Sequence, residues 1–230
     1  MKFFEINGPF FKIGTELADL MILTLYWLIG CLPIITIGNS TAALFYVYGK
    51  KMRNEDVYIT KDFIKSYKNN FKQSIPITIL LLVLWTSAFL YTIMRPMGFD
   101  VWGIMFAGLS IFFVFEVSIV SIYVFALLSR YYMSIKSTFV TAFLLANKHI
   151  LTSIMLLIIF ATVVFFALLM PIIFIMSPAL AVAMQTFFIL RVFNKNMPNV
   201  QEDEPEVEIY EELEQKEVAP TEDKDFLKYI

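Results

Sequence analysis

Long apolar runs separated by short polar stretches dominate the first 196 residues. A hydrocarbon core of about 30 Å takes roughly 20 helical residues to cross, and five runs have or approach this length. They are residues 17–35, 75–94, 102–129, 150–173 and 178–193. The last run follows Ser177 and starts with Pro178, a pair that is typical of a helix start. The pattern therefore predicts an all-α protein, a polytopic membrane helical bundle.

The segment after the first run is too short for an ordinary span. The chain turns at Pro33 and Gly38, and it reaches Lys50 and Lys51 only a short distance later. Fifteen helical residues, 39–53, extend about 22 Å at about 1.5 Å each, and long basic side chains at their end can reach the headgroups. We interpret this segment as the return arm of a helical hairpin. A re-entrant or interfacial helix is the alternative.

The basic residues are unevenly distributed among the loops. Residues 50–74 hold seven Lys and Arg residues and residues 130–149 hold three, whereas 95–101 hold only Arg95 and 174–177 hold none. Cytoplasmic loops of membrane proteins carry the excess of Lys and Arg. We therefore predict a multi-pass protein of the cell membrane with six spans, arranged as three hairpins, and with both termini in the cytoplasm.

A repeated unit is suggested by prolines near the outer turn of each hairpin, at Pro33, Pro96 and Pro171. Residues 60–73 precede the second hairpin and residues 137–149 precede the third. Three residues recur 76 positions later in the chain: Phe63, Tyr67 and Lys72 recur as Phe139, Phe143 and Lys148. We interpret the pattern as three copies of a cytoplasmic-face amphipathic helix followed by a hairpin.

The segment 60–73 has two distinct faces when it is projected as a helix at about 100° per residue. One face is largely aromatic and contains Phe63, Ile64, Tyr67 and Phe71. An adjoining face is basic and contains Lys61, Lys65, Lys68 and Lys72. Such a helix is attracted to anionic lipids. It is also a candidate docking surface for a cytoplasmic partner, together with Phe139 and Phe143 of the later segment.

Composition and charge divide the chain into two parts. Hydrophobic residues make up 59%, with 24 Phe, above the about 45–50% of soluble domains. Residues 1–196 contain 15 basic and 8 acidic residues, whereas 197–230 contain 3 basic and 12 acidic residues. We therefore predict an integral membrane domain over 1–196 and an acidic cytoplasmic tail over 197–230. Its high charge and low hydrophobicity are typical of disorder.

Groups that carry chemistry are sparse. The nucleotide-binding, hydrolase and metalloprotease motifs do not occur, and the single histidine, His149, has no cluster of metal-ligating residues beside it in the sequence. We therefore predict that the protein is not an enzyme, has no cofactor or metal site, and does not bind nucleic acid. The lipid bilayer is the partner that the sequence indicates directly.

Two acidic residues lie inside apolar runs, where a carboxyl group is costly and often functional. Glu116 lies midway along 102–129, and we expect it to be neutral, or hydrogen-bonded to hydroxyl groups such as those of Thr86, Tyr91 or Thr162. A role in binding a solute or a proton is the alternative. Asp19 lies near the cytoplasmic end of the first run, where we expect it to pair with a basic residue. The candidates are Lys50, Arg53 and Arg130.

Residues 11–56 and 61–73 carry a recognisable motif. Its elements are Asp19-Leu20, Tyr26-Trp27, Leu32-Pro33, Thr36, Gly38, Ala42-Ala43-Leu44, Phe63, Tyr67, Asn70, Phe71 and Lys72. Over residues 8–75 the chain resembles the YesL-like family of bacterial integral membrane proteins. It departs from that family at Asn39, where proline often follows the glycine, and this leaves the turn looser.

The resemblance implies a multi-span protein of Gram-positive-type bacteria without an established biochemical activity. Relatives in that family are associated with carbohydrate uptake by ABC transporters. The resemblance therefore predicts an accessory or interaction component of such a system, with an ABC transporter subunit or another membrane protein as partner. A self-contained small-solute transporter or channel that uses Glu116 is the alternative.

Overall fold

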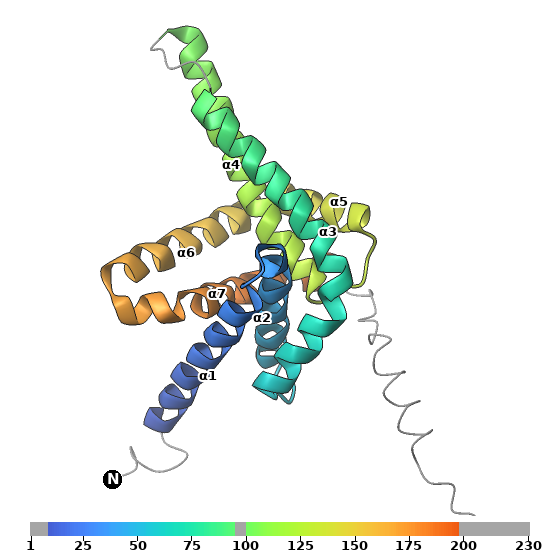
Figure 1. The fold of residues 1–230 in the computed structure, drawn as a ribbon, viewed down its shortest axis with the longest axis vertical. Helices are drawn as coiled ribbons and strands as arrows, with labels where there is room; N and C mark the ends of the chain where they lie inside the picture. Colours follow the sequence, from blue (N-terminus) through green and yellow to red (C-terminus); the bar gives the residue numbers. More distant parts are fainter. Residues whose placement is uncertain (1–8, 95–99, 198–230) are drawn as a thin grey trace, which may run out of the picture.

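The computed structural model describes residues 9–94 and 100–197, and these residues are all α-helical or in short connections. Figure 1 shows the arrangement of the elements. They are α1 (Pro9–Gly30), the short 3-10 helix η2 (Ile34–Thr36), α2 (Ile37–Met52), α3 (Ile59–Met94), α4 (Val101–Leu128), α5 (Ile135–Lys148), α6 (Ile150–Leu169) and α7 (Pro171–Asn196). The predicted all-α fold class is confirmed for this part of the chain, whereas the predicted disordered tail beyond Met197 lies outside it.

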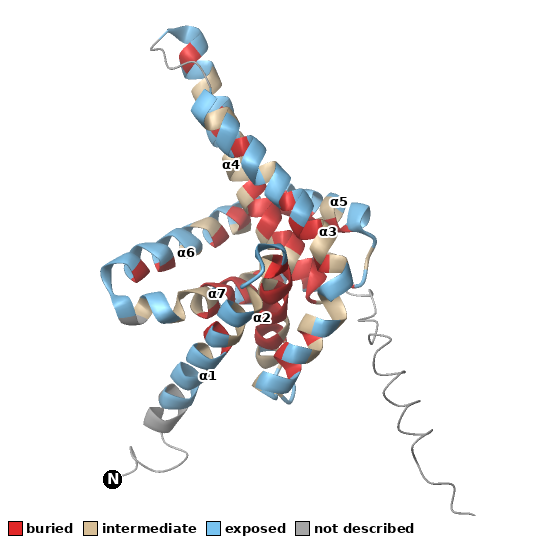
Figure 2. Ribbon diagram, in the orientation of Figure 1, coloured by how far each residue is buried: buried red, intermediate tan, exposed pale blue. Residues whose placement is uncertain are grey.

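Helix α2 is the centre of the molecule. Its residues Ala42, Ala43, Leu44 and Val47 are completely buried, and α1, α3, α4 and α7 all pack against it. Figure 2 shows α2 as an almost continuous buried ribbon among more exposed helices. Small side chains at the surface of a helix allow its neighbours to approach closely, as they do in membrane bundles.

Four described helices are long and apolar enough to cross a membrane. They are α3, α4, α6 and α7 from Ile173 onward. Helix α2 has 16 residues, so the predicted return arm exists as a helix, but the structure describes it as the buried centre of the bundle. The count of six spans remains a prediction.

The connection between α1 and α2 is fixed by Thr36. Its hydroxyl donates to the carbonyl groups of Gly30 and Pro33, at 2.7 Å in both cases. Helix α2 begins directly after Thr36, at Ile37. The prediction that Pro33 lies in the turn is confirmed, whereas Gly38 lies in the first turn of α2 and not in the connection.

Helix α3 joins two segments that were predicted to be separate elements. The amphipathic segment 60–73 and the apolar run 75–94 form one helix of 36 residues with Pro76 inside it. In Figure 1 the helix changes direction near its middle, as expected where a proline removes a backbone hydrogen bond. The amphipathic segment is therefore not a separate helix, and it packs against α1 and α2 instead.

The last hairpin turns earlier than predicted. Helix α6 ends at Leu169, and α7 begins with Pro171 at its first position, where a missing N–H costs nothing. The expected helix start at Ser177 and Pro178 is wrong, because both residues lie inside α7. Pro171 does lie at the turn, as predicted, and Pro96 lies outside the described residues.

The hairpins α3–α4 and α6–α7 extend outward from the buried centre, and Figure 2 shows their outer halves as mainly exposed. Phe89, Ile111 and Leu168 are each more than half exposed. In the α3–α4 hairpin, Ala88 is buried and the hydroxyl groups of Thr92 and Ser110 share a hydrogen bond of 2.7 Å. Apolar side chains over long, otherwise uncovered helices are what contact with a lipid bilayer requires.

Gly38 provides a direct test of the close packing around α2. A Cβ atom at this position would overlap the hydroxyl oxygen of Thr78 and the ring of Phe125. We expect Gly38→Ala to lower the free energy of unfolding by about 1–3 kcal/mol. Gly108→Ala is the matched control, because nothing lies within 4 Å of the added atom. Thermal unfolding in detergent should separate the two variants, and equal melting temperatures would contradict this packing.

Candidate functional site

Two residues of the predicted aromatic face of α3, Phe63 and Tyr67, point inward, whereas Phe71 is exposed. Phe63 is buried and stacks on Tyr26 of α1, with ring centroids 5.7 Å apart, and on Tyr67, at 6.3 Å. The Tyr67 hydroxyl donates to the carbonyl of Gly30 at 3.3 Å, and the amide of Asn39 donates to the Tyr67 carbonyl at 2.8 Å. Two of the predicted docking residues, Phe63 and Tyr67, therefore hold α3 against α1 and α2.

The opposite face of the same helical half is exposed. We call it the lysine face. It consists of Lys61, Ile64, Lys68, Phe71 and Lys72, all exposed. Ile64 is 42% exposed and Phe71 is 38% exposed, so apolar side chains adjoin the lysines. None of these three lysines forms an ion pair with a residue in the described ranges. Lys65 is half-buried and is engaged in other interactions.

The predicted counterparts in the later segment lie on α5. Phe139 is half-buried and packs against the core, whereas Phe143 is half exposed. Helix α5 packs mainly against α4 and touches α3 only slightly. Gln73 of α3 donates to the carbonyl of Met133, which precedes α5. The two segments are therefore linked through this connection rather than lying side by side.

Ion pairs connect the last turn of α2 with α1 and with the first turn of α3. Lys51 of α2 bonds Asp19 at 2.7 Å and Glu16 at 2.8 Å, both on α1. The expected partners of Asp19, namely Lys50, Arg53 and Arg130, are therefore wrong. Burial acts to lower the pKa of Lys51, but the hydrogen bonds and charges of Asp19 and Glu16 raise it, and the net shift of the pKa is upward.

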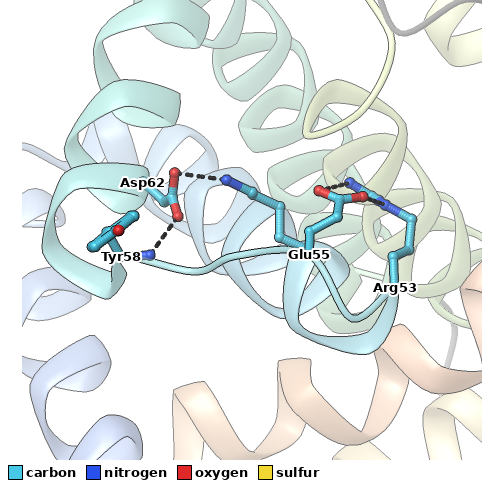
Figure 3. Close-up of polar contacts among 5 residues, drawn as sticks. Arg53, Glu55, Tyr58 and Asp62 are labelled. Atoms are coloured by element: carbon cyan, nitrogen blue, oxygen red, sulfur yellow. Dashed lines mark hydrogen bonds and ion pairs between the residues drawn. The ribbon is translucent and has the colours of Figure 1, made fainter.

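Asp62 anchors the start of α3 in the same region. Its carboxylate accepts a hydrogen bond from Lys50 at 3.0 Å and from the backbone N–H of Tyr58 at 2.9 Å, as Figure 3 shows. A carboxylate in the first helical turn also interacts favourably with the helix dipole. Beside it, Arg53 pairs with Glu55. Sequence reasoning missed Asp62, although its place in the first turn of a helix was a usable signal.

Glu116 has a different partner from those expected. Its carboxylate accepts a hydrogen bond from the side-chain amide of Asn147, in the last turn of α5, at 2.7 Å. The expected hydroxyl partners were therefore wrong, and no sequence signal pointed to Asn147. The contact joins the middle of α4 to the end of α5. Among the described residues, no group of three or more His, Cys, Asp or Glu side chains is placed to hold a metal ion.

The four long apolar helices and their exposed apolar surfaces define an integral membrane protein with several helices. Residues 20–92 match the family model described as "Protein of unknown function, DUF624". DUF624 is the family of the YesL-like membrane proteins, so the resemblance seen in the sequence is confirmed over this segment. No curated protein and no solved structure matches the chain.

The family motif has a structural explanation in this molecule. Thr36 fixes the α1–α2 turn, and Gly38 allows α2 to approach α3 and α4. Ala42 and Ala43 are fully buried in α2, and Tyr67 connects α3 to α1. The matched segment is therefore the unit that builds the centre of the bundle, and of its motif residues only Phe71 and Lys72 belong to the exposed lysine face.

The ion pair between Lys51 and Asp19 is suited to a double-mutant cycle. The two side chains are 30% and 16% exposed, so loss of one partner leaves the other charge partly desolvated. We expect Lys51→Met and Asp19→Asn each to lower the free energy of unfolding, with a coupling energy of about 1–2 kcal/mol. Lys68→Met, which removes an exposed lysine, should have little effect. Additive single effects in thermal unfolding would contradict the pairing.

Proposed function

We propose that this multi-pass membrane protein is an accessory component of an ABC-type carbohydrate uptake system. The lysine face of α3 is the surface by which it contacts an ABC transporter subunit. The resemblance to the YesL-like family supports the class of system, and the exposed basic face supports the mode of contact. The excess of Lys and Arg around this face supports a cytoplasmic location for it and for both termini.

The lysine face is the observation that carries the proposal. Its side chains combine mobile positive charges with the apolar groups of Ile64 and Phe71. Charges speed the encounter with an acidic surface, and apolar groups supply the buried area. The stacking of Phe63 on Tyr26 and the Lys50–Asp62 pair fix the opposite side of the same helix. The surface is therefore held in place before a partner arrives, which lowers the entropy cost of binding.

The packing of the centre favours an accessory role over a self-contained transporter. A transporter needs a route for its solute through the bundle. In the described residues, α2 occupies the centre, and large side chains such as Tyr123 and Leu127 of α4 are fully buried around it. A function at the surface of the protein fits this filled centre better than a function within it.

Co-purification in mild detergent tests the proposal. We expect the intact protein to bring down an ATPase or permease subunit of a carbohydrate transporter. Changing Lys61, Lys68 and Lys72 to Gln, or Ile64 and Phe71 to Ala, should reduce recovery of that subunit about tenfold, because a few residues carry most interface energy.

The control for this experiment is the pair Phe143→Ala and Leu144→Ala, which removes exposed apolar groups from α5. Partner recovery in this control should match that of the unchanged protein. If no transporter subunit is recovered, or if all variants recover it equally, the accessory role at this face is wrong.

A small-solute transporter remains the second candidate, and Glu116 is the observation in its favour. A carboxyl within an apolar helix is a default functional candidate. Because an amide oxygen can also accept the hydrogen bond from Asn147, we expect Glu116→Gln to fold normally and to retain function. Glu116→Leu should cost about 1 kcal/mol of stability. If Glu116→Gln folds normally but abolishes solute uptake in cells, the transporter assignment replaces the accessory one.

A further inference from the structure

We propose that the acidic segment Glu202–Glu208 of the same chain binds to the lysine face of α3. The proposal goes beyond the accessory role, because it assigns an occupant to this face within the isolated protein. It stands on the exposed lysines, on the place where α7 ends, and on the charge pattern of the sequence that follows. If a transporter subunit also binds there, the segment competes with it.

The lysine face offers a row of positive charges that the described structure leaves without ion pairs. Lys61, Lys68 and Lys72 lie along one side of α3, and the last lies 11 positions after the first. At about 1.5 Å per residue the row is roughly 16 Å long. An acidic partner of matching length can therefore meet all three charges.

The sequence after α7 has the complementary pattern. Glu202, Glu204, Glu206 and Glu208 alternate with other residues. Alternate residues of an extended chain lie on the same side, and Pro205 favours an extended chain. Six residues of extended chain cover roughly 20 Å, close to the length of the lysine row. A single extended strand can thus direct four carboxylates toward the row.

The end of α7 is connected, through residues 130–133, to the part of α3 that carries the lysine face. Phe193 packs against Tyr131 with ring centroids 5.7 Å apart, and Asn194 accepts a hydrogen bond from Arg130 at 3.4 Å. Met133, two residues after Tyr131, accepts the hydrogen bond from Gln73 of α3, and Gln73 adjoins Lys72. The short segment 130–133 therefore contacts both α7 and Gln73, which lies at the Lys72 end of the lysine row.

The proposed segment begins a short distance along the chain from the end of α7. Four residues lie between Met197 and Glu202, and the five steps from one to the other reach roughly 17 Å in an extended chain. Glu202 then meets Lys72, and Glu208 meets Lys61. Each exposed ion pair is weak by itself. Because the segment is tethered a few residues away, its effective concentration is high, and the sum of several weak pairs suffices.

Lysine reactivity in the purified full chain tests the contact. In non-ionic detergent at low salt, an amine-reactive reagent should label Lys61, Lys68 and Lys72 about threefold more slowly than in a variant with Glu202, Glu204, Glu206 and Glu208 changed to Gln. Lys148, exposed on α5, is the internal reference and should react equally in both. At about 1 M salt, where screening acts within about 3 Å, the difference should disappear.

A matched variant tests whether protection of the lysines depends on the segment Glu202–Glu208 itself or only on the total number of negative charges. Changing Glu211, Glu212, Glu214 and Glu217 to Gln removes the same number of charges outside the proposed segment, and it should leave the protection in place. Equal labelling of the three lysines in the unchanged protein and the Glu202–Glu208 variant would overturn the proposal. Because no partner protein is present, this outcome would leave the accessory role untouched.

Two further experiments test whether lipid or a second copy of the chain occupies the lysine face instead. If protection arises only after addition of vesicles containing an anionic phospholipid, and equally in the Glu202–Glu208 variant, the face binds lipid and the proposal is wrong. Carbodiimide cross-linking of mixed isotope-labelled and unlabelled chains identifies a second copy. Links between Lys68 and the acidic segment should join residues of one chain, and links between chains would overturn the assignment.

Discussion

Burial of a short central helix on all sides is the constraint on which the rest of this structure depends. Helix α2 can be surrounded only if its neighbours approach closely, and Gly38, Ala42 and Ala43 make that approach possible. Its first turns also bury polar side chains, and the side-chain amide nitrogen of Asn39 donates to the backbone of α3. The family motif lies in this helix and in the two that flank it because this packing is demanding.

The sequence predicted the individual helices better than it predicted which helices and side chains would contact one another. Apolar runs predicted α4, α6 and the apolar parts of α1, α3 and α7, because periodicity and length are properties of one segment. The single helix through Pro76 was missed, since a proline usually ends a helix but can also be accommodated by a bend. The partners of Asp19 and Glu116 were missed because Lys51 and Asn147 become neighbours only when α1, α2, α4 and α5 are packed.

The sequence predicted the residues of the candidate site, but it did not predict which of them would be exposed. A helical projection separated an aromatic face of α3 from a basic face, and in the structure Phe63 and Tyr67 of the aromatic face pack inward, whereas Phe71 is exposed beside the lysines. The projection could not tell which face would be covered. The hydroxyl of Tyr67 and the amide of Asn39 decide it, because both bond to backbone carbonyl groups at the α1–α2–α3 junction. The lysines remain outside, beside Ile64 and Phe71.

The burial of α2 also has a consequence for biosynthesis. The ribosome produces the chain from its amino terminus, so α2 emerges well before α7, which covers one of its sides. Until that last helix is made, the polar side chains of Asn39 and Ser40 belong to a helix whose enclosure is incomplete. Among the described helices, α2 is therefore synthesised before α3, α4 and α7, and its packing is completed only when α7 has been made.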